Sequence, residues 1–168
     1  STTSDVARHD AKPKRPLSAF NLFYRFKRRK VLEAMAAGAA TDKDSIRALI
    51  AAAPGSENLP ASAANGAAPD LWNPLRRQTI RSELKDNIEA RDTRDRLHRK
   101  DQGAMNGAMT FVEMGKLMNS SWKSCDDFAK SVFSELAEEG RKRYRQRVEE
   151  YNARCRSLAC GKKSDEKK

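Results

Sequence analysis

The residues able to form a hydrophobic core fall into two distant blocks, and this limits the folds open to the chain. Residues 12–37 and 107–153 hold nearly all of the aromatic side chains, and both blocks also carry many Lys and Arg residues. Neither block has enough apolar surface to form a core alone. We therefore expect the blocks to pack together as one all-α domain of three helices, over residues 12–37, 110–123 and 126–153.

The first block opens with two prolines that exclude a helix at its start. Pro13 and Pro16 lack backbone N–H donors and favour extended conformations in the residues before them. Ser18 is a suitable N-cap for the helix that follows. We expect that helix to end near Ala37, just before Gly38.

Helical periodicity predicts one apolar face for each helix. In the first helix, the face comprises Phe20, Phe23, Tyr24, Lys27, Val31 and Ala34, with Leu22 and Phe26 outside it. In the second, it comprises Phe111, Met114, Gly115, Met118 and Trp122. In the third, after a break with Ser124 or Asp126 as the cap, it comprises Phe133, Leu136, Ala137, Gly140, Tyr144, Val148 and Tyr151. The opposite face of the third helix is basic, with Arg141, Lys142, Arg143, Arg145 and Arg147.

The segment between the blocks has a different composition. Residues 38–69 are rich in Ala, Gly, Ser, Asn and Pro and have no aromatic residue. The stretch "TDKDSIRALIAAAPG" predicts a short helix with Thr41 as its cap and Pro54 at its end. The stretch "SENLPASAANGAAPD" is typical of a disordered linker.

A second helix is predicted within this segment. In "LWNPLRRQTIRSELKDN" Pro74 is expected in the first turn, where its missing N–H is tolerated. The predicted apolar positions of this helix are Leu75, Ile80, Leu84 and Ile88. The following stretch, "EARDTRDRLHRKDQG", is nearly all charged, and a solvated face with mixed-sign pairs is favoured over a specific site.

The overall charge indicates a polyanionic partner. The net charge is +11 and the isoelectric point is about 9.8, which favours nucleic acid or an anionic membrane surface. No apolar run approaches the roughly 18 residues of a spanning helix. Three cysteines do not make a disulfide framework, and the two histidines have no zinc-type spacing with them. We therefore expect no metal and no cofactor.

Two stretches resemble a known family. "PKRPLSAFNLF" is similar to the opening of the high-mobility-group (HMG) box. "FVEMGKLMNSSWKSCDDFAKSVFSELAEEGRKRYRQRVEEY" resembles the second and third helices of the same box. In the family a few residues join helices one and two, so we interpret residues 38–106 as an insertion with one or two short helices. Loop-closure entropy grows only logarithmically with length, so such an insertion can be tolerated. Residues 1–11 are then a flexible lead and 154–168 a basic tail.

The resemblance implies an L-shaped, three-helix fold that binds the minor groove of double-stranded DNA and bends it. Such proteins neutralise phosphates with Lys and Arg and insert apolar side chains between base steps. The residues implied to contact DNA are Lys12, Lys14, Arg15, Ser18, Asn21, Arg25, Arg28, Arg29, Phe111 and Lys116. For Arg25, Arg28 and Arg29, simple solvation is an equally weighted interpretation.

Two positions where the family places an inserted side chain are central to this expectation. The first corresponds to Asn21, where the family usually has an apolar residue, and an amide favours hydrogen bonding over insertion. The second corresponds to Phe111, which either inserts between bases or covers the core next to Met114. Ser18 matches a position that is Ser in many sequence-tolerant members, and it also suits a helix cap.

The resemblance also implies a structural core. Its residues are Phe20, Phe23, Trp122, Lys130, Phe133 and Tyr144. The stem of Lys130 is expected to pack beside Trp122. Tyr144 and Val148 are expected to hold the segment containing Pro13 and Pro16 against the third helix.

The resemblance implies a non-enzymatic architectural DNA-binding protein. An enzyme is disfavoured because the sequence has no Gly-rich phosphate loop and no catalytic Cys-His or Ser-His arrangement. The alternative is a protein-interaction module whose insertion docks a chromatin protein through Leu71, Trp72 and Leu75. The resemblance implies a nuclear location, with mitochondria as the alternative. The sequence leaves the oligomeric state open.

Overall fold

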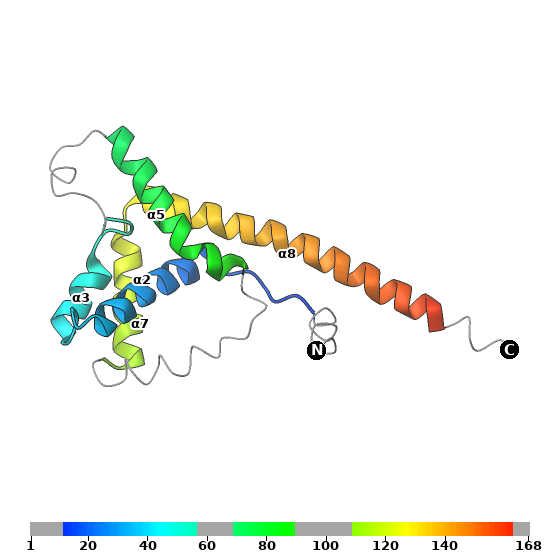
Figure 1. Ribbon diagram of the computed structural model, residues 1–168, viewed down its shortest axis with the longest axis horizontal. Helices are drawn as coiled ribbons and strands as arrows, with labels where there is room; N and C mark the ends of the chain where they lie inside the picture. Colours follow the sequence, from blue (N-terminus) through cyan, green and yellow to red (C-terminus); the bar gives the residue numbers. More distant parts are fainter. Residues whose placement is uncertain (1–11, 57–68, 90–108, 163–168) are drawn as a thin grey trace. The chain divides into compact units, whose positions relative to one another are not determined.

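The computed structural model describes residues 12–56, 69–89 and 109–162. Within these residues the chain is all-α, with five helices and no strand (Figure 1). The chain divides into two compact units. We call Leu17–Ala137 the core unit, and Ser1–Pro16 with Glu138–Lys168 the terminal unit.

Helix α2 (Ala19–Ala36) begins where the sequence predicts. Its buried face, however, differs from the predicted one, because Leu22 and Phe26 are 2% and 1% exposed. The prediction that these two residues lie outside the apolar face was wrong. The reason is that α2 contacts α3, α5 and α7, so more than one face of the helix is buried. Gly38, with φ of +71°, ends the helix in a left-handed conformation that glycine adopts without strain.

Helix α3 (Lys43–Ala51) is the first helix of the predicted insertion. Its N-cap is Asp42, whose side chain accepts a hydrogen bond from the Ser45 N–H at 2.7 Å, and the predicted cap, Thr41, lies outside the helix. A carboxylate interacts more favourably with the positive end of a helix than a hydroxyl does. Ile46 and Ile50 are each 1% exposed and anchor α3 in the core.

Helix α5 (Pro69–Glu89) is the second helix of the insertion and is longer than predicted. Pro74 lies inside the helix, so the prediction that it sits in the first turn was wrong. Ile80 and Leu84 are fully buried, as predicted, whereas Leu75 is 50% exposed. The side chain of Ile88 lies outside the described part of the structure. The helix therefore contacts the core through one narrow edge.

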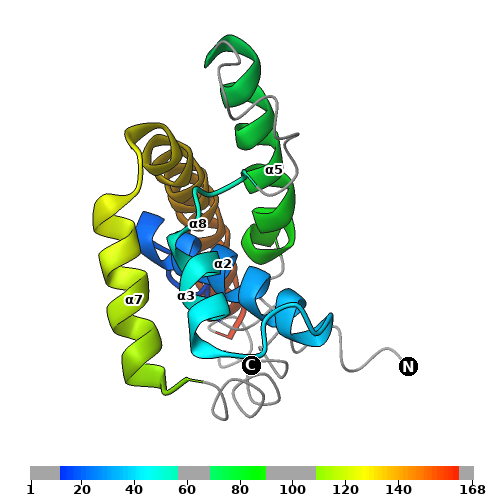
Figure 2. The same cartoon turned by 90° about the vertical axis from the view of Figure 1, so that its left-hand side faces the viewer.

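Helix α7 (Phe111–Ser124) carries Met114 and Met118 into the core. Two contacts show that α7 runs parallel to α3. Lys43 lies 3.0 Å from Glu113 near the start of both helices, and Ser121 donates to the carbonyl of Ile50 at 2.6 Å near their ends. Figure 2 shows the two helices side by side.

An aromatic cluster joins α2, α7 and α8 at the centre of the core unit. The ring of Trp122 lies 5.2 Å from that of Phe23 and 6.1 Å from that of Phe133, and Phe23 and Phe133 lie 5.6 Å apart. Such tilted and edge-on pairs are each worth about 0.5–1.5 kcal/mol beyond the area that they bury. The ammonium of Lys130 lies 6.0 Å from the centre of the Trp122 ring, which agrees with the expected packing.

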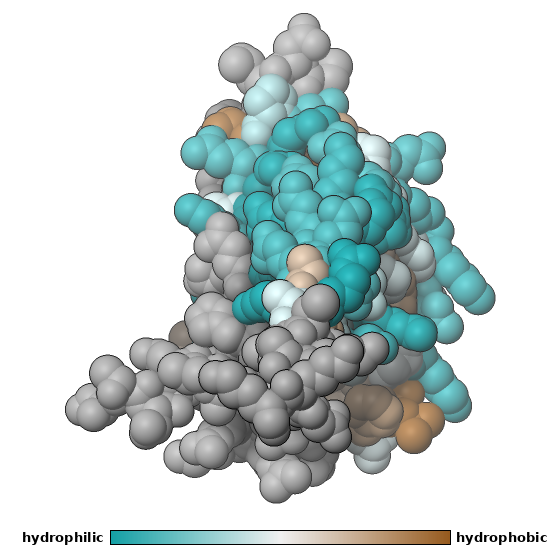
Figure 3. All heavy atoms as spheres, turned by 90° about the vertical axis from the view of Figure 1, so that its right-hand side faces the viewer, coloured by the Kyte–Doolittle hydropathy of each residue, from teal (hydrophilic) through white to brown (hydrophobic). Residues whose placement is uncertain are grey.

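Helix α8 (Asp127–Lys162) is capped by Asp126, one of the two caps predicted. It continues well past the predicted end near residue 153. Its first part, with Val132, Phe133 and Leu136, is buried in the core unit. From Asn152 to Ser157 every side chain is exposed, and the described side chains on the face drawn in Figure 3 are predominantly hydrophilic. Helix propensity and local pairs, rather than core packing, stabilise this last part.

Candidate nucleic-acid interface

One face of α2 carries four of the predicted DNA-binding residues. They are Ser18, Asn21, Arg25 and Arg28, which follow one another at intervals of three or four positions. This spacing aligns side chains along one side of a helix. The first two are exposed and the two arginines are half-buried. This face of α2 is therefore polar and basic from Ser18 to Arg28.

Ser18 acts as the N-cap of α2. Its side-chain oxygen accepts a hydrogen bond from the backbone N–H of Asn21 at 3.2 Å. The cap role predicted from the sequence is thus confirmed, and Ser18 remains exposed on the same face. The side chain of Asn21 is also exposed, so its amide is accessible to hydrogen-bond partners from outside the chain.

Arg29 lies apart from this face. It forms an ion pair with Glu33 at 2.9 Å and donates to the backbone carbonyl of Glu83 at 3.0 Å. The second contact ties α2 to α5. Arg29 therefore already has a structural role in the core unit, whereas its predicted role toward DNA stays a prediction.

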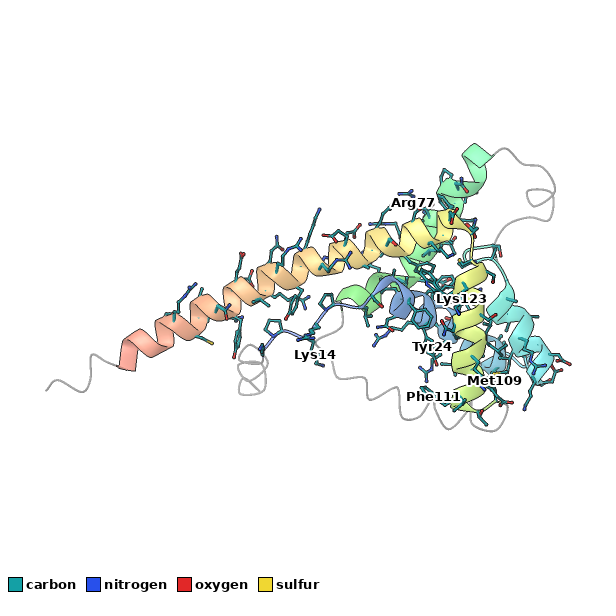
Figure 4. All side chains as sticks on the ribbon, turned by 180° about the vertical axis from the view of Figure 1, so that it is seen from behind. Lys14, Tyr24, Arg77, Met109, Phe111 and Lys123 are labelled. Atoms are coloured by element: carbon teal, nitrogen blue, oxygen red, sulfur yellow. The ribbon has the colours of Figure 1, made fainter. Side chains whose placement is uncertain are left out.

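The start of α7 exposes a large aromatic side chain. Thr110 and Glu113 form a capping box, in which each side chain accepts a hydrogen bond from the backbone N–H of the other residue. The cap fixes the first turn, in which Phe111 is 70% exposed and Val112 is 63% exposed. Met109, on the other side of the cap, is only 3% exposed, and Figure 4 shows Met109 and Phe111 on opposite sides of the start of α7. Phe111 therefore does not cover the core.

The capping box holds Glu113 in its charged form. A hydrogen bond from the Thr110 backbone is the largest of several contacts that lower the pKa of Glu113 to about 2, and a hydrogen bond from Lys43 adds to it. A charged carboxylate at this position also interacts favourably with the positive end of the helix dipole. The orientation of Phe111 is thus supported by a cap that stays intact at neutral pH.

Two exposed cations follow Phe111 along α7. Lys116 was predicted as a DNA contact, and Lys123 was not. Both are exposed, and with Val112 they are spaced at four and seven residues along one stripe. In Figure 4, Tyr24 of α2 lies on the same side of α7 as Phe111, whereas α3 lies on the other side. The seven-residue spacing from Lys116 was the signal that could have identified Lys123.

Tyr24 lies on α2, on the side of α7 that also carries Phe111 (Figure 4). Burial raises the pKa of Tyr24, and the nearby positive charge of Arg28 lowers it in part. The hydroxyl is therefore neutral at physiological pH. A neutral phenol does not repel a phosphate, so Tyr24 is compatible with an anionic partner at this surface.

The terminal unit carries the other predicted contacts. Residues 12–18 form no helix, and Lys12, Lys14 and Arg15 are exposed. Pro16 faces α8, because a Cβ atom added to Gly140 would lie 3.7 Å from the Pro16 Cβ. Tyr144 and Val148 of α8 are half-buried, in agreement with packing in this unit. Pro16 thus contacts the helix, while the three cations before it are exposed.

Part of the basic face predicted for α8 is neutralised locally. Glu138 pairs with Arg141 at 2.7 Å and with Arg145 at 3.4 Å. The hydrogen bond from Arg141 is the largest contribution to the lowered pKa of Glu138. These two arginines therefore offer less positive charge to a partner than the sequence alone indicates.

Taken together, the core unit exposes the ring of Phe111 at the start of α7, the amide of Asn21 on α2, and the cations Lys116 and Lys123 along α7. Among the residues described, no group of His, Cys, Asp and Glu side chains is arranged to hold a metal ion. Across the described ranges, no helix is long and apolar enough to cross a membrane. Comparison of the chain with protein-family models, curated proteins and solved structures gave no significant match.

Proposed function

We propose that this chain is a non-enzymatic, architectural DNA-binding protein that binds the minor groove with little sequence preference and bends the duplex. Its partner would be double-stranded DNA that is already bent, distorted or flexible. The proposal follows the resemblance to the HMG box and the net charge of +11. By the same resemblance, we propose a role in chromatin organisation or transcription, in the nucleus or in mitochondria.

The observation that carries the proposal is the exposure of two adjacent apolar side chains at the start of α7, Phe111 at 70% and Val112 at 63%. An exposed phenylalanine lacks the hydrophobic stabilisation that burial gives, and its ring is available to contact a partner. Insertion between two base steps would bury the ring and kink the duplex. Lys116 and Lys123 lie on the same helix, where they could neutralise the phosphates beside the kink.

Asn21 and Phe111 would act differently at the two positions where the family inserts a side chain. Its exposed amide on α2 can hydrogen-bond to a base edge or a sugar, but it is a poor wedge. Phe111 would therefore be the one inserting side chain of the two family positions. A single wedge favours DNA that is already bent, because the protein then supplies less of the energy of bending.

A gel-shift comparison of a four-way junction with a linear duplex of equal length tests the proposal. We expect tighter binding to the junction, and an affinity for both that falls steeply between 50 and 200 mM salt, because phosphate contacts dominate. Equal, weak binding to both DNAs at low salt would contradict the proposal.

The alternative of a protein-interaction module has less support. It required α5 to expose an apolar face, but α5 packs back on the core through Arg76, Ile80 and Leu84. Leu75 is 50% exposed, and a single exposed leucine is ordinary for a surface. The side chains of Leu71 and Trp72, which the prediction also used, lie outside the described part of the structure.

A further inference from the structure

The carboxyl end of α3 is held by both helices of the candidate interface. Lys27 of α2 donates from its ammonium to the carbonyl of Leu49 at 3.1 Å and to the carbonyl of Ala52. Ser121 of α7 donates from its hydroxyl to the carbonyl of Ile50 at 2.6 Å. The last carbonyls of a helix have no partner within the helix. Here side chains from α2 and α7 supply those partners at a single point.

Lys27 is unusual because it is fully buried, with an exposed fraction of 0%. A buried ammonium is costly unless it is well hydrogen-bonded. The negative end of the α3 dipole and two carbonyls meet that requirement. Because α3 belongs to residues 38–106, the two carbonyls that bind this ammonium come from the insertion.

Helix α5 of the same insertion adds a second set of contacts. The guanidinium of Arg76, 4% exposed, makes hydrogen bonds of 3.2 and 2.8 Å to the two carboxylate oxygens of Asp126, between α7 and α8. It also donates to the Pro54 carbonyl at 3.0 Å. Nearer the carboxyl end of α5, Glu83 pairs with Lys30 of α2. The insertion therefore contacts each helix of the core unit through buried or half-buried polar groups.

We propose that the insertion fixes the position of α2 relative to α7, with Lys27 and Ser121 as the positioning residues. The consequence for binding rests on the proposed DNA-binding function. The face of α2 with Asn21 and the start of α7 with Phe111 would be held at a set spacing before DNA arrives. Such preorganisation lowers the entropy that binding must overcome. The chain should then favour DNA whose bend already matches that spacing.

The positioning itself can be measured without DNA. Spin labels on A36C and N119C would report the distance between α2 and α7, in a chain whose native cysteines are replaced by alanine. Ala36 and Asn119 are exposed. Asn119 lies between Lys116 and Lys123 on α7, so these labels are used only for the measurement without DNA. We expect a narrow distance distribution in the parent and a broader or shifted one in Lys27→Met, measured well below the unfolding temperature of each.

A matched control separates positioning from charge. Arg47→Met removes one positive charge from the exposed side of α3, where Arg47 pairs with Asp44. This variant should leave the distance distribution unchanged. Ser121→Ala removes the hydrogen bond to the Ile50 carbonyl without any change of charge, and it should also broaden the distance distribution. It therefore tests the positioning even if the Lys27→Met protein is unfolded. Unchanged distributions in folded Lys27→Met and in Ser121→Ala would overturn the proposal.

DNA binding then tests the consequence. We expect Lys27→Met to lower the preference for a four-way junction over linear DNA by about fivefold or more, at the lower end of typical coupling between linked sites. Arg47→Met should weaken binding to both DNAs equally. If the parent chain binds no DNA, the proposed function fails while the distance measurement still decides the positioning. A preference unchanged in Lys27→Met despite a broadened distribution would overturn the functional consequence alone.

Discussion

Phe111 and Phe133 show how differently one residue type is used in this chain. Phe133 is fully buried and contacts three other aromatic rings, whereas Phe111 is 70% exposed at the start of α7. Removing each ring should therefore change a different property. For Phe133 the property is stability, and for Phe111 it is binding.

Phe111→Ala should weaken binding to junction DNA by about 1–3 kcal/mol, the usual value of an aromatic ring stacked on a base. Its free energy of unfolding should change by less than about 0.5 kcal/mol, because the ring is mostly exposed. Gel shifts and urea titrations measure the two effects. Leu75→Ala, at another exposed apolar side chain, is the control and should leave junction binding unchanged. A normal affinity for Phe111→Ala would argue against insertion.

Phe133→Ala should lower the free energy of unfolding by about 3–5 kcal/mol, because it leaves a cavity at the centre of the aromatic cluster. A loss of this size approaches the total stability of a small domain. Urea denaturation followed by circular dichroism measures it. Val112→Ala, at a side chain that is 63% exposed, should change stability little, and equal losses in both variants would refute the assigned core.

At the scale of the elements, helix ends decide how the helices are placed. Side chains cap the amino ends of α2, α3, α7 and α8, and the carboxyl end of α3 is bound by Lys27 and Ser121. The cap before α7 matters most for function, because it sets the turn that exposes Phe111. Glu113 makes that cap sensitive to acid.

Lowering the pH should weaken the cap before α7. The folded pKa of Glu113 is about 2, below its ordinary value of 4.5, so its charge contributes stability above about pH 4.5 and that contribution is lost as the pH falls toward 2. Glu113→Gln keeps the capping geometry without the charge. The difference in Tm between wild type and this variant should shrink over that range. A difference that stays constant from pH 7 to 2 would contradict the assignment.

At the scale of the whole molecule, the insertion belongs to the core. Ile46, Ile50, Ile80 and Leu84 are all at most 1% exposed, and they lie in the same compact unit as the helices of the two blocks. The core unit is thus a single hydrophobic cluster drawn from both blocks and from the segment between them.

Deletion of residues 38–106 should therefore destabilise the core unit. The deletion exposes apolar surface on α2, α7 and α8, and it removes the carbonyls that bind Lys27. We expect a broad, weakly cooperative urea transition and loss of near-ultraviolet circular dichroism. The single variant Arg47→Met should unfold as the wild type does. A cooperative deletion variant that still prefers junction DNA would show that the insertion is dispensable.

The sequence by itself determined the helical class, the approximate ends of α2 and α7, and the main aromatic core. These depend on local signals: prolines before Ser18, caps at Ser18 and Asp126, and apolar residues at helical spacing. Where two neighbouring residues can both cap a helix, as Thr41 and Asp42 can, the predicted N-cap was wrong by one residue. The charge pattern indicated an anionic partner but could not reveal the pairing of Glu138 with Arg141.

Only the tertiary structure decided the role of the insertion and the partners of Lys27. Periodicity placed Lys27 on the apolar face of its helix, but nothing local indicates that carbonyls more than twenty positions away will bind its ammonium. The same holds for Leu22 and Phe26, which are buried because α2 is covered from several sides. Periodicity reports one face of a helix, whereas burial depends on how many neighbours surround it, and those neighbours come from distant parts of the chain.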